Sequence, residues 1–190
     1  MVTTEQALGQ DFDTMRLAVA REAVDRLGLL KREAEAIIYH MLDKRFAEHH
    51  PKAICTEYRK DGEQLSAIEK KSIGLRSDAF FSTKAFVELT EKGKKDPLKA
   101  HEITLLRAHF TLRRYQTVIQ ARSENISQFL DDYKYDVLQM DCPACGQLEG
   151  IITKGNDAFI FPPSDCACDT ANYSLQPYVD WLAGWNDPDS

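Results

Sequence analysis

Four of the five cysteines lie in two close pairs near the carboxyl end of the chain, and their spacing restricts the fold more than any other feature. Cys142 and Cys145 stand three residues apart, a spacing at which a tight turn lets two thiolates reach one ion. Cys166 and Cys168 stand two apart, so on an extended segment both sulfurs project from the same face. The pairs predict a four-thiolate metal site, best matched by tetrahedral zinc. Such a site has no open coordination position, so the ion would hold the fold rather than activate water.

The segment between the two cysteine pairs has the pattern of a β-hairpin. Residues 150–153 and 158–161 have the character of short strands, and Lys-Gly-Asn-Asp between them is a turn sequence. A hairpin here would bring the pairs together. The Cys-Pro-x-Cys-Gly run, the hairpin and the second pair together resemble a zinc ribbon over residues 141–169. The resemblance implies a small structural zinc module, although zinc ribbons usually close with a second Cys-x-x-Cys and this chain has Cys-Ala-Cys.

Three other interpretations of the cysteines are compatible with the sequence: disulfides in an exported protein, an iron centre, and reduced cysteines without a metal. The acidic start of the chain lacks the basic-then-apolar order of a secretory signal. We therefore expect a cytoplasmic protein in a reducing compartment, where paired cysteines favour metal over disulfide. The fifth cysteine, Cys55, is interpreted as a small buried residue rather than a nucleophile.

Length and charge limit the classes of protein to which this chain can belong. With 190 residues, of which 43% are hydrophobic, it can bury a sizeable core as one domain or as one domain with a small appendage. Its longest apolar runs fall far short of a membrane span, so no membrane association is expected. The formal net charge of −6 argues against a protein that coats nucleic acid, because phosphate binding relies on accumulated Lys and Arg.

Most of the chain before the cysteines has helical periodicity. We therefore predict a mainly α fold, a helical bundle followed by a small zinc-stabilised β-hairpin module. The predicted helices share an apolar period of three or four residues between capping signals and a glycine or proline. They cover residues 11–28, 30–49, 66–73, 83–91 after Ser82 as N-cap, 97–122 after Asp96 as cap, and 127–133. Pro51 is expected to end the second of these helices, and residues 52–60 are expected to contain a short strand.

The composition changes near residue 137 from helical to turn- and strand-like, and this change predicts a domain boundary. Residues 1–136 would form the helical domain, and residues 137–190 the zinc-ribbon-like module, which is too small to fold alone without metal. Residues 173–185 have the spacing of an amphipathic segment, which we expect to pack against the helical domain rather than bind a partner.

Arginines on the predicted helix 96–122 are the candidates for contact with nucleic acid. Arg107, Arg113 and Arg114 could form a basic surface that contacts phosphates, or they could pair with acidic neighbours, which is the expected outcome. Arg113 also belongs to a polar stripe that we interpret as the solvent-exposed face of this helix.

The run Arg-Phe-Ala-Glu-His-His places Arg45 and His50 five positions apart at the end of a predicted helix. This spacing resembles the motif of HEPN ribonucleases, an all-helical family that often forms dimers, although Phe46 stands where that family usually has a polar residue. The resemblance covers six residues. It implies metal-independent RNA cleavage, with His50 in acid–base chemistry and Arg45 stabilising phosphate, and it implies a homodimer. Two histidines before a proline are more often a solvated helix end.

The sequence therefore predicts a cytoplasmic regulatory or interaction protein with one structural zinc ion on Cys142, Cys145, Cys166 and Cys168. Its expected partner is nucleic acid or a protein complex. The alternative is a HEPN-like ribonuclease that uses Arg45 and His50.

Overall fold

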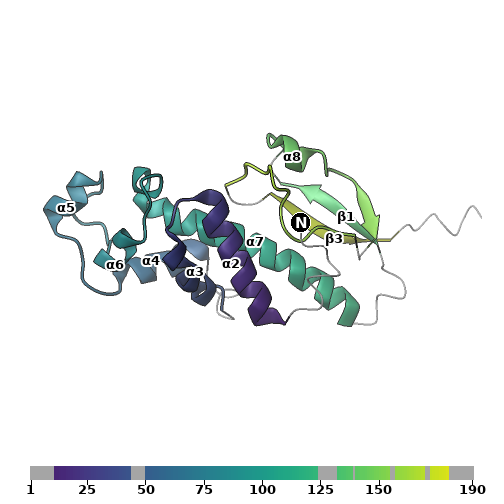
Figure 1. The fold of residues 1–190 in the computed structure, drawn as a ribbon, viewed down its shortest axis with the longest axis horizontal. Coiled ribbons are helices and arrows are strands. Elements are labelled where there is room, and N and C mark those ends of the chain that lie inside the picture. Colours follow the sequence, from purple (N-terminus) through teal and green to yellow (C-terminus); the bar gives the residue numbers. More distant parts are fainter. Residues whose placement is uncertain are drawn as a thin grey trace, which may run out of the picture. The chain divides into compact units, whose positions relative to one another are not determined.

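The computed structural model describes residues 11–43, 50–123, 132–138, 140–154, 157–169 and 172–179 of the chain. It confirms a mainly α fold with a small three-stranded antiparallel sheet near the cysteine pairs (Figure 1). The helical elements are α2 (Phe12–Leu27), η1 (Arg32–Ala34), α3 (Glu35–Met41), α4 (Pro51–Lys60), α5 (Ala67–Ser72), α6 (Thr83–Val87), η3 (Gly93–Lys95), α7 (Pro97–Ser123) and α8 (Pro143–Gly146). The strands are β1 (Asp132–Val137), β2 (Ile152–Lys154) and β3 (Tyr173–Tyr178).

The described residues fall into two compact units. The helical unit comprises Asp11–Leu112, and the sheet unit comprises Arg113–Cys168 with the described part of Asn172–Ser190. The division lies inside α7, so the last part of this helix belongs with the sheet. Strand β1 also belongs to the sheet unit. The folding boundary near residue 136 stays a prediction.

Helix α2 begins and ends where the sequence predicts. At its start, the side chain of Asp11 accepts a hydrogen bond of 2.9 Å from the backbone N–H of Thr14. At its end, Gly28 adopts the left-handed conformation with φ of 59°, which glycine enters without the steric cost of a Cβ. Met15 and Val19 are fully buried on the inner face of the helix.

The helix predicted over residues 30–49 is shorter in the structure. A single 3-10 turn, η1, leads into α3, and α3 ends at Met41. Residues 44–49 lie outside the described residues. The buried side chains of this region, Ala34, Ile38 and Met41, keep the spacing of three or four that predicted a helix here.

The short strand predicted over residues 52–60 is wrong, because this segment is helix α4. Pro51 stands in the first turn of α4, where its missing N–H costs no hydrogen bond and its fixed φ suits the helix. The proline therefore starts a helix here instead of ending one. Cys55 and Arg59 lie one helical turn apart and are both buried, so α4 has a clear inner face.

Serines cap the starts of the next two helices, as predicted for Ser82. Ser66 and Glu69 form a reciprocal capping box at the start of α5. The side chain of Ser82 accepts a hydrogen bond from the backbone N–H of Ala85 at the start of α6. Helix α6 ends at Val87, short of the predicted residue 91.

Helix α7 is the longest helix in the described part of the chain and carries residues of both units. It begins at Pro97, after Asp96, and it covers the whole of the predicted range 97–122. Its buried side chains in the helical unit include Leu105, Ala108 and Leu112.

The turn after α2 and the turn after α6 lie side by side in the helical unit. Thr90 Oγ1 donates a hydrogen bond of 2.7 Å to the carbonyl oxygen of Gly28, and the backbone N–H of Thr90 donates to the carbonyl oxygen of Leu29 at 3.1 Å. Gly93 allows this close approach, because a Cβ at its position would lie 2.0 Å from the carbonyl oxygen of Leu29.

The sheet has the strand order β2-β1-β3, and both pairs of neighbours are antiparallel (Figure 1). Residues 132–133 belong to β1, so the helix predicted over residues 127–133 is wrong at these two positions, and residues 127–131 lie outside the described residues. Tyr133, Tyr135 and Val137 alternate with more exposed residues, which is the pattern of a strand buried on one face. Strand β3 accounts for the first part of the predicted amphipathic segment 173–185, and residues 180–190 lie outside the described residues.

The hairpin predicted between residues 150–153 and 158–161 is wrong in its strand pairing. Residues 152–154 pair with β1, with Lys134 opposite Ile152, and not with residues 158–161. Within residues 158–161, Ala158 and Ile160 are buried. The backbone N–H of Phe159 donates a hydrogen bond of 2.7 Å to the hydroxyl of Tyr135. Side chains of β1 and β3 therefore help to hold this segment.

The sheet unit has a core of its own, built on one face of the sheet. Its buried members are Val118, Tyr133, Tyr135, Val137, Cys142, Ala144, Cys145, Ala158, Cys166, Cys168, Tyr173 and Leu175. Of the helices in the described part of the chain, none combines the length and the apolar character that crossing a bilayer requires.

Candidate metal centre

The four paired cysteines come together in the core of the sheet unit. Cys142 immediately precedes α8 and Cys145 lies within it, whereas Cys166 and Cys168 lie on the loop after residues 158–161. All four side chains are buried, and their sulfur atoms lie within 4.8 Å of one another. The predicted clustering of the two pairs is therefore confirmed.

The distances between sulfur atoms fit a metal ion at their centre. Cys145 Sγ lies 3.5 Å from Cys166 Sγ and 3.8 Å from Cys168 Sγ. A tetrahedral zinc ion with Zn–S bonds of about 2.3 Å holds its sulfur ligands about 3.8 Å apart. A disulfide needs sulfur atoms about 2.0 Å apart, and all four cysteines are free thiols. The geometry therefore favours a metal site over disulfides.

Local sequence explains how the first pair is presented. Pro143 starts the single turn of α8, and the backbone N–H of Gly146 closes it with a 2.8 Å hydrogen bond to the carbonyl oxygen of Cys142. This turn brings Cys145 back to the side of Cys142.

Electrostatics in the cluster favour a bound cation. Burial raises the pKa of Cys142, but hydrogen bonds from the backbone N–H groups of Cys145 and Ala167 outweigh burial and bring it to about 6. Burial and the neighbouring thiols raise the pKa of Cys145, and they raise the pKa of Cys168 to about 12. Four thiolates this close together repel one another, and a coordinated metal ion would supply the positive charge that offsets the repulsion.

Hydroxyl groups of tyrosines hold the chain that leads to the second pair. Tyr173 on β3 donates hydrogen bonds to the carbonyl oxygens of Phe159 and Phe161, at 2.7 Å and 3.0 Å. The rings of Tyr135 and Tyr173 meet edge to face, with centroids 5.4 Å apart. The sheet thus fixes the start of the loop that carries Cys166.

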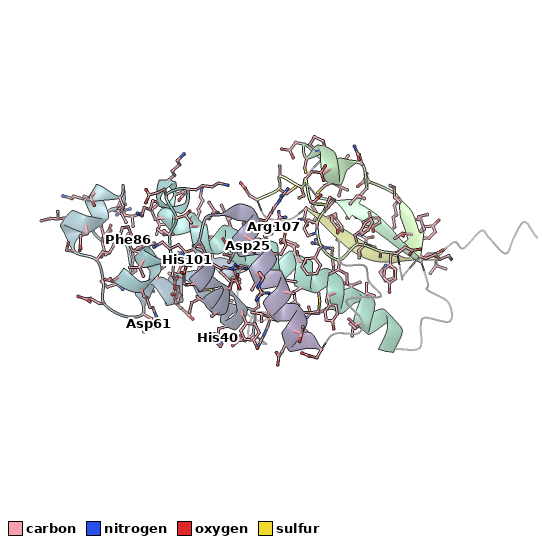
Figure 2. The ribbon with its side chains drawn as sticks, in the orientation of Figure 1. Asp25, His40, Asp61, Phe86, His101 and Arg107 are labelled. Carbon is pink, nitrogen blue, oxygen red and sulfur yellow. The ribbon has the colours of Figure 1, made fainter. Side chains whose placement is uncertain are left out.

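The arginines proposed as phosphate contacts do not form one surface. Arg107 is 1% exposed, and its Nη2 donates to Glu22 Oε1 at 2.8 Å within the helical unit (Figure 2). Arg114 is 2% exposed and bonds to residues of the sheet unit, among them Asn172. Arg107 therefore pairs with an acidic neighbour, which is the outcome expected from the sequence, and neither Arg107 nor Arg114 presents its guanidinium at a surface. Arg113 is exposed, as its place on the polar stripe predicts.

The residues of the ribonuclease hypothesis are only partly described. Arg45 lies outside the described residues. His50 is exposed, and its Nδ1 accepts a hydrogen bond of 3.2 Å from the backbone N–H of Lys52, so it caps α4. A cavity of about 270 Å³ opens between α3 and α4, lined by Ile37, His40, Met41, Asp43, Ile54, Glu57 and Tyr58. His50 is not among these lining residues.

A partly buried polar network in the helical unit was not foreseen from the sequence. The Tyr58 hydroxyl donates to Glu88 Oε1 at 2.5 Å, and Glu88 Oε2 lies 2.7 Å from Nε2 of His101, which is labelled in Figure 2. Burial, with the hydrogen bond to Glu88, raises the pKa of Tyr58. These residues come from α4, the end of α6 and α7, so no local motif could have indicated the network.

The fifth cysteine, Cys55, lies on α4. Burial raises the pKa of Cys55 to about 12, which agrees with its interpretation as an inert buried thiol.

The chain was compared with protein-family models, with curated proteins and with solved structures, and it matches none of them.

Proposed function

We propose that Cys142, Cys145, Cys166 and Cys168 bind one zinc ion that stabilises the sheet unit, and that the protein acts as an interaction protein. The observation that carries this proposal is the presence of four buried sulfur atoms within 4.8 Å of one another. Four thiolates complete a tetrahedral shell and leave no position for a substrate, so the ion serves the fold.

Two features support a protein partner rather than nucleic acid. Arg107 and Arg114, two of the three candidate phosphate contacts, are buried in a chain of net charge −6. In the sheet unit, Leu138, Met140 and Ile152 are 48%, 62% and 46% exposed. Large apolar side chains at a surface are typical of interfaces between proteins, whereas nucleic acid is bound by accumulated positive charge.

Metal analysis of the purified protein tests the zinc proposal. We expect about one zinc ion per chain in the wild type, because one tetrahedral site uses all four thiolates. Cys142→Ser and Cys166→Ser each remove a ligand and should lower the zinc content. Cys55→Ser is the matched control, since Cys55 is buried but lies outside the cluster, and it should keep the zinc.

Two results would contradict the zinc proposal. One is wild-type protein that contains iron instead of zinc. The other is metal-free protein whose sheet unit is as ordered as that of the metal-loaded protein, as judged by amide hydrogen exchange.

A further inference from the structure

Arg114 is a charged side chain in the core of the sheet unit, 2% exposed. Its Nε donates to the carbonyl oxygen of Ile160 at 2.6 Å, and its Nη1 donates to the carbonyl oxygen of Tyr173 at 2.8 Å. The guanidinium also lies 4.2 Å from the centroid of the Tyr173 ring. Removing a charge from water is costly, so the sheet unit holds this cation through an extensive set of contacts.

Two of these contacts lie on either side of the second cysteine pair in the sequence. Ile160 precedes Cys166 and Cys168, and Tyr173 follows them. Because one rigid guanidinium binds the carbonyl groups of both residues, it holds the two ends of this loop together. The position of the second pair therefore depends on Arg114.

Asn172 connects the guanidinium to a sulfur atom of the cluster. Asn172 is fully buried, and its Oδ1 accepts hydrogen bonds from Arg114 Nη1 at 2.7 Å and from the backbone N–H of Tyr173 at 3.1 Å. Two donors at one end of the amide identify that end as the oxygen. The other end, Nδ2, is therefore a donor, and it lies 3.9 Å from Cys166 Sγ.

The charges in this chain of contacts complement each other. A zinc ion with four thiolates carries two net negative charges, and the site is buried. A guanidinium two hydrogen bonds away, with an amide N–H directed at one sulfur, offsets part of this negative charge. Partners of this kind around a metal site orient its ligands and set its affinity.

We propose that Arg114, acting through Asn172 and through the carbonyl groups of Ile160 and Tyr173, positions Cys166 and Cys168 and raises the affinity of the cluster for zinc. Arg114 and Asn172 are positioning residues, because neither is a ligand. This inference rests on the zinc-binding function proposed above, and it adds which residues outside the ligand set control the site.

Zinc affinity, measured on the full chain by competition with a chromophoric chelator, tests the inference. Asn172→Asp keeps an acceptor for Arg114 and for the N–H of Tyr173, but it replaces the donor near Cys166 with a carboxylate oxygen. We expect its zinc affinity to fall by about 10- to 100-fold, the usual effect of losing an outer partner of a metal ligand. Arg114→Lys keeps the positive charge but cannot bind the same set of oxygens, and its affinity should fall as well.

Arg113→Lys is the matched control, because it makes the same change at the adjacent, exposed position of α7. Its zinc affinity should equal that of the wild type. Cobalt substitution supplies a second readout: the thiolate-to-cobalt charge-transfer band should shift in Asn172→Asp, since that variant loses the donor at one sulfur, and should not shift in Arg113→Lys. Circular dichroism in excess zinc confirms that the variants are folded. If Asn172→Asp does not fold, the zinc affinity of Arg114→Lys, which retains a buried cation, is compared with that of the wild type instead.

The possible failures are distinguishable. If the wild-type protein binds no zinc, the proposed function fails before any variant is compared. If the wild type binds zinc and the folded variants at positions 114 and 172 match it in affinity and in cobalt spectrum, the inference is overturned and the proposed function stands.

Discussion

Arg113 and Arg114 are neighbours in the sequence with opposite environments. Successive residues of an α-helix are rotated by about 100°, so adjacent side chains point to different sides. On α7 this rotation leaves Arg113 exposed and directs Arg114 into the core of the sheet unit. Residue type alone therefore says little about the role of an arginine, and its position on the helix decides whether it meets solvent or protein.

A prediction at the residue scale concerns the pair of Arg107 and Glu22. Glu22→Ala removes the carboxylate that accepts hydrogen bonds from the buried guanidinium, so we expect the free energy of unfolding to fall by about 2 kcal/mol. Arg21→Ala is the control. Arg21 pairs with Glu35 at 3.2 Å, but its side chain is 53% exposed, and its loss should cost less than about 1 kcal/mol. Urea denaturation measures both changes, and equal effects would contradict the structural role of Arg107.

Another residue-scale prediction concerns His50. The side chain of His50 is exposed, and its Nδ1 accepts a hydrogen bond from the backbone N–H of Lys52 at the start of α4. His50 does not line the cavity between α3 and α4. We therefore expect purified protein to leave a mixed RNA substrate intact in a gel assay. Cleavage that is present in the wild type and absent in His50→Ala would support the ribonuclease alternative instead. A variant that alters the exposed Lys52, Lys52→Ala, controls for nonspecific effects at this helix start.

At the scale of elements, short-range signals set most helix starts, while contacts between elements set several ends. Asp11, Ser66 and Ser82 cap the helices that follow them, and the cap at Ser82 was predicted from residue type. By contrast, α6 stops at Val87, and the segment after it bonds to the turn at Gly28. A continued helix would use the same backbone groups for its own hydrogen bonds.

The close contact between these turns leads to a prediction for Gly93. Gly93→Ala places a methyl group 2.0 Å from the backbone oxygen of Leu29, so the two segments must separate, and we expect a loss of about 3 kcal/mol in the free energy of unfolding. Gly28→Ala is the comparison. It strains a left-handed residue with no atom within 4 Å of the new Cβ, and it should cost about 1 to 2 kcal/mol. Thermal unfolding measures the stability of both variants. If Gly28→Ala were the less stable of the two, the segments around Leu29 and Gly93 would be able to separate at little cost.

At the scale of the whole molecule, the two units differ in what stabilises them. The helical unit buries apolar side chains from several helices, including Met15, Ile38 and Leu105. The core of the sheet unit is small, and four of its twelve buried members are the paired cysteines. A core in which thiols replace larger apolar side chains gains less from burial, so metal binding should be part of the folding energy of this unit.

Limited proteolysis of Cys142→Ser tests this difference between the units. Structural zinc in isolated modules contributes on the order of 10 kcal/mol, so the loss of one ligand should disorder the sheet unit and leave the helical unit resistant. Mass spectrometry of the resistant fragment locates the folding boundary. A fragment that ends near residue 136 would match the sequence-based boundary, and one that ends before Asp132 would mean that β1 unfolds with β2 and β3, with which it pairs. Degradation of the whole chain would show that the units fold as one.

The sequence by itself determined the features that depend on residues a few positions apart. The cysteine pairs, the caps of α2, α5 and α6, and the long helix after Asp96 follow from spacing and residue type, because their physical causes act within one or two turns of chain. The start of α4 at Pro51 also depends on local sequence. Proline, however, is compatible both with the end of one helix and with the first turn of the next, so the sequence did not distinguish the two.

Only the tertiary structure decided the features that join distant segments. The pairing of β2 with β1 instead of residues 158–161, the burial of Arg107 and the link from Arg114 to Cys166 all depend on long-range contacts. Arg107 meets Glu22 across 85 positions, and Arg114 meets Asn172 across 58. Because such partners are chosen by packing and by the need to satisfy buried polar groups, no periodicity or motif in either segment identifies them.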